Sequence, residues 1–520
     1  MFRQQWGCDP RDLPAAYMSR DRLKLTRLYY EKYGRGGTDD VTWSDLEMDE
    51  VFFRINHTRS FAGEQILYLQ LHEPAEEEEL SFFENLASLF GQDEEGRLLY
   101  EYRLNDLGKS DESYYLPVML GVISDYVPNN INFYRCLQLL LVSFLAGMIV
   151  FRSALWGGLM ISVALINLMI YIVTKAKMEH MFYALYNICG ILRFCRFAEN
   201  TWPLSESSVL DQVRFDLELL KNTERAAGSF TEKKTAAFND PRYLLADYVW
   251  GITLIDLMAY EKIMREFAGN EEAILRLFRF AGMIDSAIAC ASFRKSLGLW
   301  CVPGFDQAEK IVCQDLYHPL IKNAVKNDIV LGKNTVITGA NASGKSTFMK
   351  ATAINVLLAR TIHTCTAAKF SIPMIDVMSS MAIHDDIILG ESYYIREIKY
   401  MKRMLDRLKR DGTVLFVIDE IMTGTNQREG LAISEALLGF FADKQCFVIA
   451  ATHDVVLLQK LRDKYRCCHF EYRLNEGRIT FDYKIRQGAG GGSNAVNLLA
   501  MFEYPEEIID HTKQILTDGG

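Results

Sequence analysis

The stretch Thr338-Gly339-Ala340-Asn341-Ala342-Ser343-Gly344-Lys345-Ser346-Thr347 decides the fold of the C-terminal part of the chain. Its residues from Gly339 to Ser346 match the phosphate-binding pattern Gly-x-x-x-x-Gly-Lys-Ser. An apolar run at 335–338 precedes the pattern and predicts a strand, and residues 348–358 predict a helix behind it. In such a strand–loop–helix unit, backbone N–H groups and the helix N-terminus surround a phosphate. A chance glycine-rich turn is the alternative, but it would not require the flanking strand and helix.

The residues of this loop are predicted to bind ATP together with Mg²⁺. Lys345 would reach the β- and γ-phosphates, and the hydroxyl of Ser346 would coordinate the metal ion. The predicted nucleotide-binding set is Gly339, Ala340, Asn341, Ala342, Ser343, Gly344, Lys345, Ser346 and Thr347.

A second strand supplies the acidic groups that this chemistry needs. Residues 414–418 are five consecutive apolar residues, which is typical of a parallel strand covered on both faces. Asp419 at its end is predicted to hold Mg²⁺ with Ser346, directly or through water. Glu420 beside it is predicted to be the base that orients the attacking water.

A third apolar run, at 446–450, ends shortly before His453. A histidine at such a strand end can sense the γ-phosphate, whereas an isolated one is more often an ordinary loop residue. Three such strand ends in this order predict an α/β P-loop NTPase domain of the ABC type, and hence an ATPase. Its predicted catalytic residues are Glu420 and His453.

These motifs together resemble the MutS family of ATPases. The resemblance covers roughly two hundred residues in the family's order and rests on residues 317–320, 338–347, 419–426, 451–454, 493–496 and 504–507. It implies a helical lever, the family's core domain, before the ATPase domain, and a family role in binding mismatched DNA for DNA mismatch repair. It also implies a homodimer, because in the family two short C-terminal helices, here within 493–516, pack on the partner's ATPase domain.

The same resemblance adds Ser392 to the nucleotide-binding site. Residues 385–394 are similar to the family's signature segment, whose serine contacts the γ-phosphate bound to the other subunit. Ser392 matches that serine, although Tyr393 and Tyr394 differ from the usual Thr-Phe. The alternative for Ser392 is a simple helix N-cap.

Composition limits the partners and the compartment. The 520 residues carry a net charge of −10, so the overall charge does not attract nucleic acid, and DNA is left open as a partner. The eleven cysteines include no CxxC pair, which favours reduced thiols in a cytoplasmic protein. The N-terminal residues lack the apolar core of a signal peptide.

Helical periodicity before residue 305 predicts a mostly α-helical lever. Residues 58–67 are similar to the start of the family's core domain, and the polar residues 223–240 predict a loop or a helix tip. The expected order is a helical segment at 1–35, the first lever part at 36–130, a two-helix hairpin at 131–175, the lever return at 176–300, the ATPase domain at 301–487 and a dimerisation segment at 488–520.

Phe82-Phe83-Glu84 contains the letters Phe-x-Glu of the family's mismatch-reading motif. In the family that motif lies in a separate N-terminal α/β domain, and the residues before the expected lever leave no room for one. Phe82 is therefore predicted to pack within a helix, and mismatch reading is not expected of this chain.

The most apolar part of the chain is predicted to be a transmembrane helical hairpin. Its halves, 133–151 and 154–173, are joined by Arg152-Ser153, and the second half has twenty residues without a charge. Twenty helical residues cross about 30 Å of hydrocarbon. The alternative is a buried helical hairpin inside a soluble lever.

Charges around this hairpin predict its orientation. Arg135, Lys175 and Lys177 lie towards the outer ends, and Arg152 alone lies in the turn, which favours the cytoplasm for both flanks. The expected location is the cytoplasmic face of the cell membrane, with both termini cytoplasmic.

Three functions are compatible with these features. The first is a membrane-tethered MutS-like ATPase dimer in which hydrolysis changes the geometry of the lever. The second is an authentic DNA mismatch-repair factor. The third is an ABC-type ATPase that acts on a membrane or protein partner without a DNA role. A solute transporter, one form of the third, is disfavoured because one hairpin per chain offers no polar path through the membrane.

Overall fold

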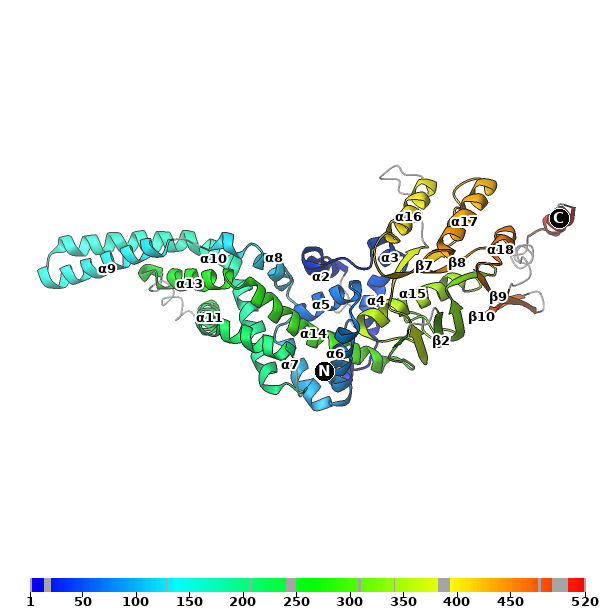
Figure 1. The fold of residues 1–520 in the computed structure, drawn as a ribbon. Coiled ribbons are helices and arrows are strands. Elements are labelled where there is room, and N and C mark those ends of the chain that lie inside the picture. Colours follow the sequence, from blue (N-terminus) through cyan, green and yellow to red (C-terminus); the bar gives the residue numbers. More distant parts are fainter. Residues whose placement is uncertain are drawn as a thin grey trace.

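The chain changes from helices to a mixture of helices and strands near residue 300. The structure, a computed structural model, describes residues 2–13, 20–127, 130–204, 208–239, 249, 251–306, 310–340, 342–381, 393–475, 478–488 and 504–518. Figure 1 shows an elongated molecule with a helical hairpin at one end and the strand-rich part at the other. This layout confirms a mostly helical N-terminal region followed by an α/β domain.

The described helices of the first part are α1 Phe2–Gln5, α2 Arg20–Tyr33, α3 Asp40–Asp45, α4 Met48–Ile55, α5 Phe61–His72, α6 Glu77–Gln92, α7 Glu94–Asn105, α8 Leu116–Leu120, α9 Ile131–Phe151, α10 Ala154–Thr201, α11 Ser208–Asn239, α13 Ile255–Ala268 and α14 Glu271–Ser296. The strands are β1 Gly304–Phe305, β2 Lys310–Leu316, β3 Asn327–Gly332, β4 Asn334–Thr338, β5 Lys369–Ile372, β6 Ile375–Ser380, β7 Thr413–Asp419, β8 Cys446–Ala451, β9 Arg466–Asn475 and β10 Arg478–Gln487. The helices of this second part are α15 Lys345–Ile362, α16 Tyr393–Arg407, α17 Gln427–Ala442, α18 Val455–Leu461 and α20 Glu506–Asp518.

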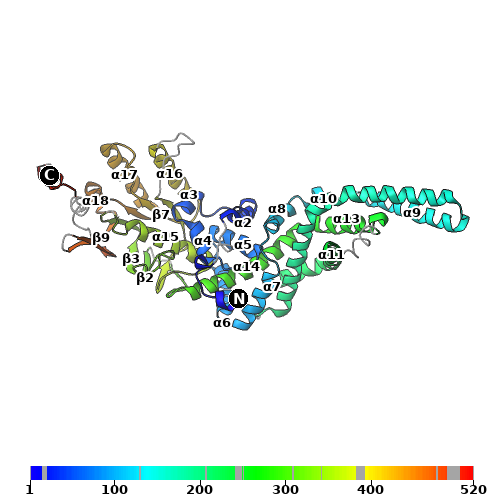
Figure 2. The same cartoon turned by 180° about the vertical axis from the view of Figure 1, so that it is seen from behind.

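Helix α14 lies in the middle of the helical region and packs on α5 and α6 (Figure 2). Its buried Asp285 accepts hydrogen bonds from the backbone N–H groups of Arg59, at 2.9 Å, and of Ser60, at 2.8 Å. The first N–H groups of a helix lack intrahelical partners, so a carboxylate at the start of α5 is stabilising. Gly63 permits this approach, because a Cβ there would lie 2.1 Å from Asp285 Oδ2. The contact joins the end of the helical region to its beginning.

A buried ion pair joins α14 to α6 in the same way. Arg294 donates to the two carboxylate oxygens of Glu84 at 2.8 Å and 2.6 Å, and His363 Nδ1 lies 3.4 Å from the same carboxylate. Burial alone would raise the pKa of Glu84, but the neighbouring His363 and Arg294 outweigh it and lower the pKa to about 2.

We expect Glu84→Gln to lower the free energy of unfolding by about 3 kcal/mol at pH 7, because it leaves the Arg294 guanidinium buried without its countercharge. A carboxylate with a depressed folded-state pKa stabilises the fold above its unfolded pKa, near 4.5. The difference between variant and wild type should therefore persist down to that pH and shrink as the pH falls towards 2. Urea unfolding at pH 7 and pH 3 measures it.

The exposed Glu78 on the same helix provides the matched control, Glu78→Gln. It should change stability by no more than about 0.5 kcal/mol. An equal loss in both variants, or a Glu84→Gln effect that does not depend on pH, would contradict the role of the pair.

Phe82 lies in α6, as predicted for a packing residue. Its ring is partly buried, and its centroid lies 6.5 Å from that of Trp202 in a stacked arrangement. The Phe-x-Glu letters therefore belong to a helix of the core, and Glu84 is the partner of Arg294.

One prediction about a helix is wrong. Residues 223–240 were expected to form a loop or helix tip, but α11 continues to Asn239. The lysine, glutamate, arginine and alanine residues in that stretch are strong helix formers, and this propensity outweighs the polarity that suggested a loop. Helix α10 runs unbroken from Ala154 to Thr201, so the second half of the apolar hairpin continues into the helical region.

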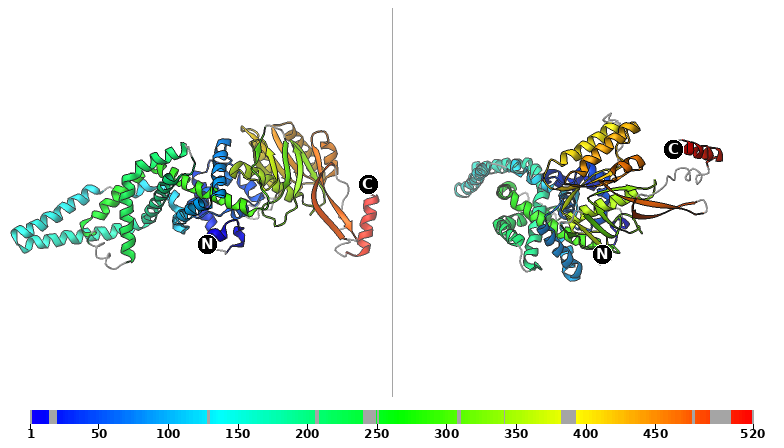
Figure 3. Two further views of the ribbon diagram at one scale, coloured as in Figure 1. Left: turned by 90° about the horizontal axis from the view of Figure 1, so that it is seen from below. Right: turned by 45° about the vertical axis from the view of Figure 1, so that its right-hand side comes forward.

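Helix α9 and the first half of α10 form a hairpin that projects from the helical region (Figure 3). Arg152 adopts a left-handed backbone with φ +47°, and Ser153 caps α10. Both helices are long and apolar enough, by length and composition, to cross a membrane. In the most apolar 18-residue stretch of each helix, only 17% is buried. The hairpin is therefore not enclosed in the core of the helical region.

The strand-rich part contains two sheets. The first has the strand order β10-β9-β4-β8-β7-β6, and the second has the order β1-β5-β2-β3. Strands β4, β8, β7 and β6 are parallel neighbours, and the apolar residues of β7 are all buried, as predicted for a strand covered on both faces. Strands β9 and β10 form an antiparallel pair at the edge of the first sheet. Helix α20 forms the end of the C-terminal segment, and the other helix expected after residue 492 lies outside the described residues.

Helix α3 connects the helical region to the edge of the first sheet. Ser379 at the end of β6 donates its backbone N–H to Thr42 Oγ1, at 3.0 Å, and its hydroxyl to Asp45 Oδ2, at 2.7 Å. Lys350 on α15 forms an ion pair with Glu47 at 2.6 Å. These contacts tie the beginning of the helical region to the elements that carry the predicted phosphate loop.

Candidate functional site

Three strand ends predicted to carry the chemistry lie side by side. Strand β8 separates β4 from β7, and Ala451 is paired with both Ile337 and Asp419. Because these strands are parallel, their carboxyl ends share one edge of the sheet. The loop after β4, the acidic pair after β7 and the histidine after β8 therefore meet there.

The phosphate loop comprises residues 339–346, and its described residues include two glycines with unusual backbone conformations. Gly339 has φ +144° and Gly344 has φ +104°, conformations that side-chain-bearing residues rarely adopt. Lys345 is buried and donates to the carbonyl oxygens of Gly339, at 2.8 Å, and Ala340, at 3.1 Å. The ammonium group of Lys345 thus bonds to the first two residues of the loop. Burial lowers the pKa of Lys345. The buried hydroxyl oxygen of Ser343 has no hydrogen-bond partner among the described residues.

A hydroxyl and a carboxylate form a candidate Mg²⁺ site beside this loop. The hydroxyl of Ser346 donates to Asp419 Oδ2. Burial raises the pKa of Asp419, and the nearby Glu420 carboxylate adds to that effect. Hard oxygen ligands of this kind, with open space for water and phosphate oxygens, suit Mg²⁺. The residues present therefore fit the metal that the sequence predicts.

Glu420 and His453 face each other across the end of β8. His453 Nδ1 lies 3.2 Å from Glu420 Oε1, and the backbone N–H of Glu420 donates to Ala451 O at 3.2 Å. Glu420 has φ +56°, a left-handed conformation that costs a non-glycine residue energy and tends to occur at functional sites. Both predicted catalytic side chains are partly exposed to solvent at this edge.

Glu397 of α16 is a site residue that sequence reasoning missed. It is buried and accepts hydrogen bonds from the backbone N–H groups of Thr423 and Gly424, both at 2.9 Å. Tyr393 adds a hydroxyl contact to Thr423 Oγ1 at 3.1 Å. These bonds hold the loop that follows Asp419 and Glu420. In the sequence Glu397 looks like any other acidic residue of a charged helix.

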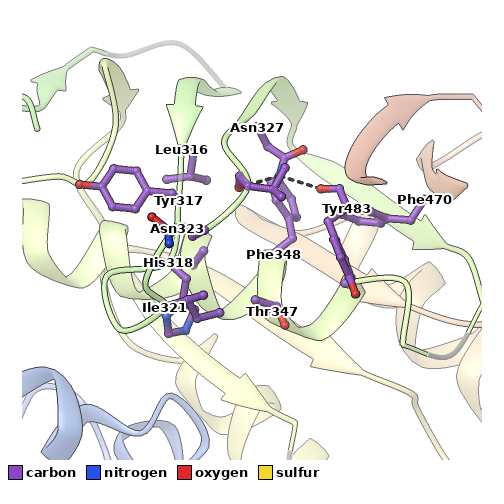
Figure 4. Close-up of a pocket in the computed structure, with 14 residues that line it drawn as sticks. Leu316, Tyr317, His318, Ile321, Asn323, Asn327, Thr347, Phe348, Phe470 and Tyr483 are labelled. Atoms are coloured by element: carbon purple, nitrogen blue, oxygen red, sulfur yellow. Dashed lines mark hydrogen bonds between the residues drawn. The ribbon is translucent and has the colours of Figure 1, made fainter. Parts of the chain in front are cut away.

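Two adjoining cavities lie around the phosphate loop. One of about 370 Å³ is lined by Ala342, Gly344, Lys345, Ser346, Thr347, Met381, Tyr393, Asp419, Glu420 and Tyr483. The other, of about 250 Å³, is mostly apolar and is shown in Figure 4. They share Gly344, Thr347 and Tyr483, so a single elongated ligand could occupy both.

The apolar cavity has the character of a site for an uncharged ring. Its lining includes Phe348, Phe470 and His318 (Figure 4). Burial lowers the pKa of His318 to about 4, so its imidazole is neutral near pH 7. In the sequence, His318 stands out only within the family resemblance. Phe470 and Tyr483 carry no such signal, because they come from β9 and β10 far along the chain.

Two predicted nucleotide-binding residues lie outside the described part of the structure. Asn341 belongs to the phosphate loop, and Ser392 directly precedes α16. Their predicted roles are neither supported nor contradicted by the geometry.

Comparison with known proteins matches residues 335–518 to the family model MutS domain V. The chain is 28% identical to a DNA mismatch repair protein MutS of Bacillus pumilus over 229 residues, 42% of this chain and 26% of that protein. It is 29% identical to the MutS of Natronomonas pharaonis over 275 residues, 50% and 32% of the two chains, and 27% identical to that of Persephonella marina over 310 residues, 58% and 34%. The matched segment thus spans about a third or less of each of these relatives.

Proposed function

From its membership of the MutS family, through that family's C-terminal domain V, we propose that this chain is an ATPase that binds ATP with Mg²⁺ and hydrolyses it as a dimer. The observation that carries the proposal is the meeting of Lys345, the Ser346–Asp419 pair and the Glu420–His453 pair at one sheet edge. These are the groups that a P-loop NTPase needs to hold phosphates, a metal ion and a water molecule.

Each residue has one task in this proposal. The phosphate loop binds the phosphates through its backbone N–H groups, and Lys345 exchanges its two carbonyl contacts for phosphate oxygens. Ser346 and Asp419 would hold Mg²⁺, which neutralises charge on the phosphates. Glu420 orients the attacking water, and its contact with His453 keeps the carboxylate near the γ-phosphate position.

The base of the nucleotide is assigned to the apolar cavity. A planar ring would fit among Phe348, Phe470 and Tyr483, with the neutral His318 as a polar contact. This places the triphosphate in the neighbouring cavity beside Lys345, because the two cavities share residues of the phosphate loop.

Dimerisation is the part of the proposal that requires Ser392. We expect Lys345→Ala chains to lose ATP binding, because the ammonium that would contact two phosphates is gone. Ser392→Ala chains should bind ATP but leave a partner's site incomplete. Mixing the two after subunit exchange should raise phosphate release above that of either variant, since the intact phosphate loop of the Ser392→Ala chain then faces an intact Ser392.

Lys444→Ala, at an exposed lysine after α17, is the control for the first variant and should bind ATP normally. If demonstrated heterodimers show no gain in activity, Ser392 is only a helix cap.

The hairpin of α9 and α10 is proposed to tether the ATPase to the cytoplasmic face of the cell membrane. Its exposed apolar surface supports this, because soluble proteins rarely expose large continuous apolar patches. The exposed Arg135 near the base of the hairpin is consistent with a cytoplasmic flank. Hydrolysis would then move the helical region relative to the membrane.

The relatives are named DNA mismatch repair proteins, and we propose a DNA role for this chain on that ground alone. The alternative is an ATPase that acts on a membrane or protein partner without DNA, which the net charge of −10 and the exposed hairpin favour. Mismatch reading is not proposed, because Phe82 packs in α6.

Phosphate release by the detergent-purified protein distinguishes these functions. Homoduplex, mismatched and branched DNA, and phospholipid vesicles, are added in separate reactions. Stimulation by mismatched DNA above homoduplex supports the repair role, and stimulation by vesicles alone supports the alternative. If no Mg²⁺-dependent hydrolysis occurs under any condition, the ATPase proposal is overturned.

A further inference from the structure

The helical residues 251–253 before α13 end beside the hairpin, at a residue with a left-handed backbone. Leu254 has φ +56°, which breaks the helix between Thr253 and Ile255. A helix end leaves its last carbonyl groups without intrahelical partners. Here the carbonyl of Ile252 accepts from Asn167 Nδ2 at 2.8 Å, and that of Thr253 accepts from Gln138 Nε2 at 2.7 Å.

Both amide side chains come from the apolar hairpin, and they lie at one level of it. Gln138 precedes the Arg152-Ser153 turn by fourteen residues, and Asn167 follows that turn by fourteen residues. Fourteen helical residues correspond to about 21 Å. If the turn reaches the far side of a hydrocarbon layer of about 30 Å, this level lies about 9 Å inside the near side.

The contact between this segment and the hairpin is tight. Asn167 and Tyr171 are buried, and a Cβ on Gly251 would lie 2.5 Å from Tyr171 Cδ1. Two turns further along, the buried Glu261 accepts from the backbone N–H groups of Asn130, at 3.2 Å, and Ile131, at 3.3 Å. The segment therefore follows the base of the hairpin from this level back to the start of α9.

The outer side of the segment is apolar over the same depth. Ile255 is 53% exposed, whereas the one acidic side chain nearby, Asp256, is buried. Between Gly251 and Glu261 no charged side chain is exposed, and the first exposed charge is Lys262. The exposed charge thus begins where the near surface of the hydrocarbon layer would be.

We propose that residues 251–258 form a wedge that inserts into the near leaflet of a phospholipid bilayer beside the hairpin. The inference rests on the membrane hairpin of the proposed function and adds a third lipid-facing element to it. A break in helical backbone at membrane depth requires side chains that satisfy the freed carbonyls. Gln138 and Asn167 supply them, which also explains two amides that are otherwise costly in an apolar span.

The wedge also connects the bilayer to the ATPase-bearing body. Helix α13 continues from Ile255 into the core of the helical region, where Met264 and Phe267 are fully buried. It packs on α11 and α14. A movement of these two helices would therefore shift the wedge within one leaflet of the bilayer.

Site-specific photocrosslinking tests the wedge without interference from the native cysteines. Benzoylphenylalanine replaces Ile255 in the wedge, Leu145 in the hairpin, or Phe215 in α11, an equally apolar residue that is 64% exposed. Each full-length variant is reconstituted in vesicles of phosphatidylcholine and phosphatidylglycerol and irradiated, and lipid adducts are counted by mass spectrometry.

Adducts at Ile255 and Leu145, but not at Phe215, are the expected result. Adducts at Leu145 alone would overturn the wedge and leave the membrane hairpin standing, whereas adducts at neither position would overturn both. Equal adducts at Phe215 would also overturn the wedge, because exposure alone would explain them.

A second comparison tests the capping amides. Combining Gln138→Leu with Asn167→Leu should lower the adduct yield at Ile255 roughly tenfold by releasing the two carbonyls, while adducts at Leu145 remain. Ser143→Leu, at an exposed position of α9, is the matched control and should change neither yield. An unchanged yield at Ile255 in the double variant would contradict the role of the amides.

Discussion

Glu420→Gln is expected to slow ATP hydrolysis at least about 100-fold while ATP binding is retained, which is the usual contribution of a general base. The amide keeps the shape of the side chain but cannot accept a proton from the attacking water. Lys345, Ser346 and Asp419 are untouched, so the phosphates and Mg²⁺ are still held. Single-turnover phosphate release and a separate nucleotide-binding measurement check the two parts of this result.

Glu435→Gln is the matched control for this variant. Glu435 lies on α17, is partly exposed and pairs with Lys460 rather than with the site. Its replacement should leave hydrolysis unchanged. Normal turnover in Glu420→Gln would contradict the role of Glu420, whereas loss of ATP binding would show that the carboxylate holds the metal ion instead.

Removing the distal hairpin is expected to transfer the protein from the membrane to the soluble fraction. We choose deletion of 139–166 with a short glycine-serine turn, because it keeps Gln138 and Asn167, the residues that contact the segment before α13. The intact chain should resist alkaline carbonate extraction, and the shortened chain should not, since the apolar parts of α9 and α10 that remain are too short to cross a bilayer. Extraction followed by immunoblotting measures the distribution.

Phe215→Lys combined with Leu219→Lys is the control for this deletion. It removes two exposed apolar side chains from α11, which are 64% and 50% exposed, without altering the hairpin. This variant should stay in the membrane fraction. Recovery of the intact chain as a soluble, monodisperse protein without detergent would refute the tether.

Local, contiguous patterns determined the parts of the fold that were correctly predicted. The strand at 335–338 with the helix behind it and the buried strand ending at Asp419 each lie within one short stretch of sequence. The limits of the apolar hairpin at the Arg152-Ser153 turn were also evident, because one charge interrupts a long apolar run. The order of the three strand ends was enough to expect Ser346, Asp419, Glu420 and His453 at one site.

Only the tertiary structure decided which distant groups complete that site. Glu397 binds backbone N–H groups 26 and 27 residues away, and Phe470 and Tyr483 come from strands more than a hundred residues after the phosphate loop. A carboxylate on a charged helix carries the same sequence signal whether it faces solvent or a loop.

The pairing of Gln138 and Asn167 with the carbonyls before α13 is a second case of contacts that the sequence does not reveal. In the sequence these amides only interrupt an apolar run. Their partners, the carbonyls of Thr253 and Ile252, are 115 and 85 residues away in the chain, respectively. Periodicity reports which residues share a face of one helix, but it does not report which other element covers that face. That is decided when the chain packs and buried polar groups must find their partners.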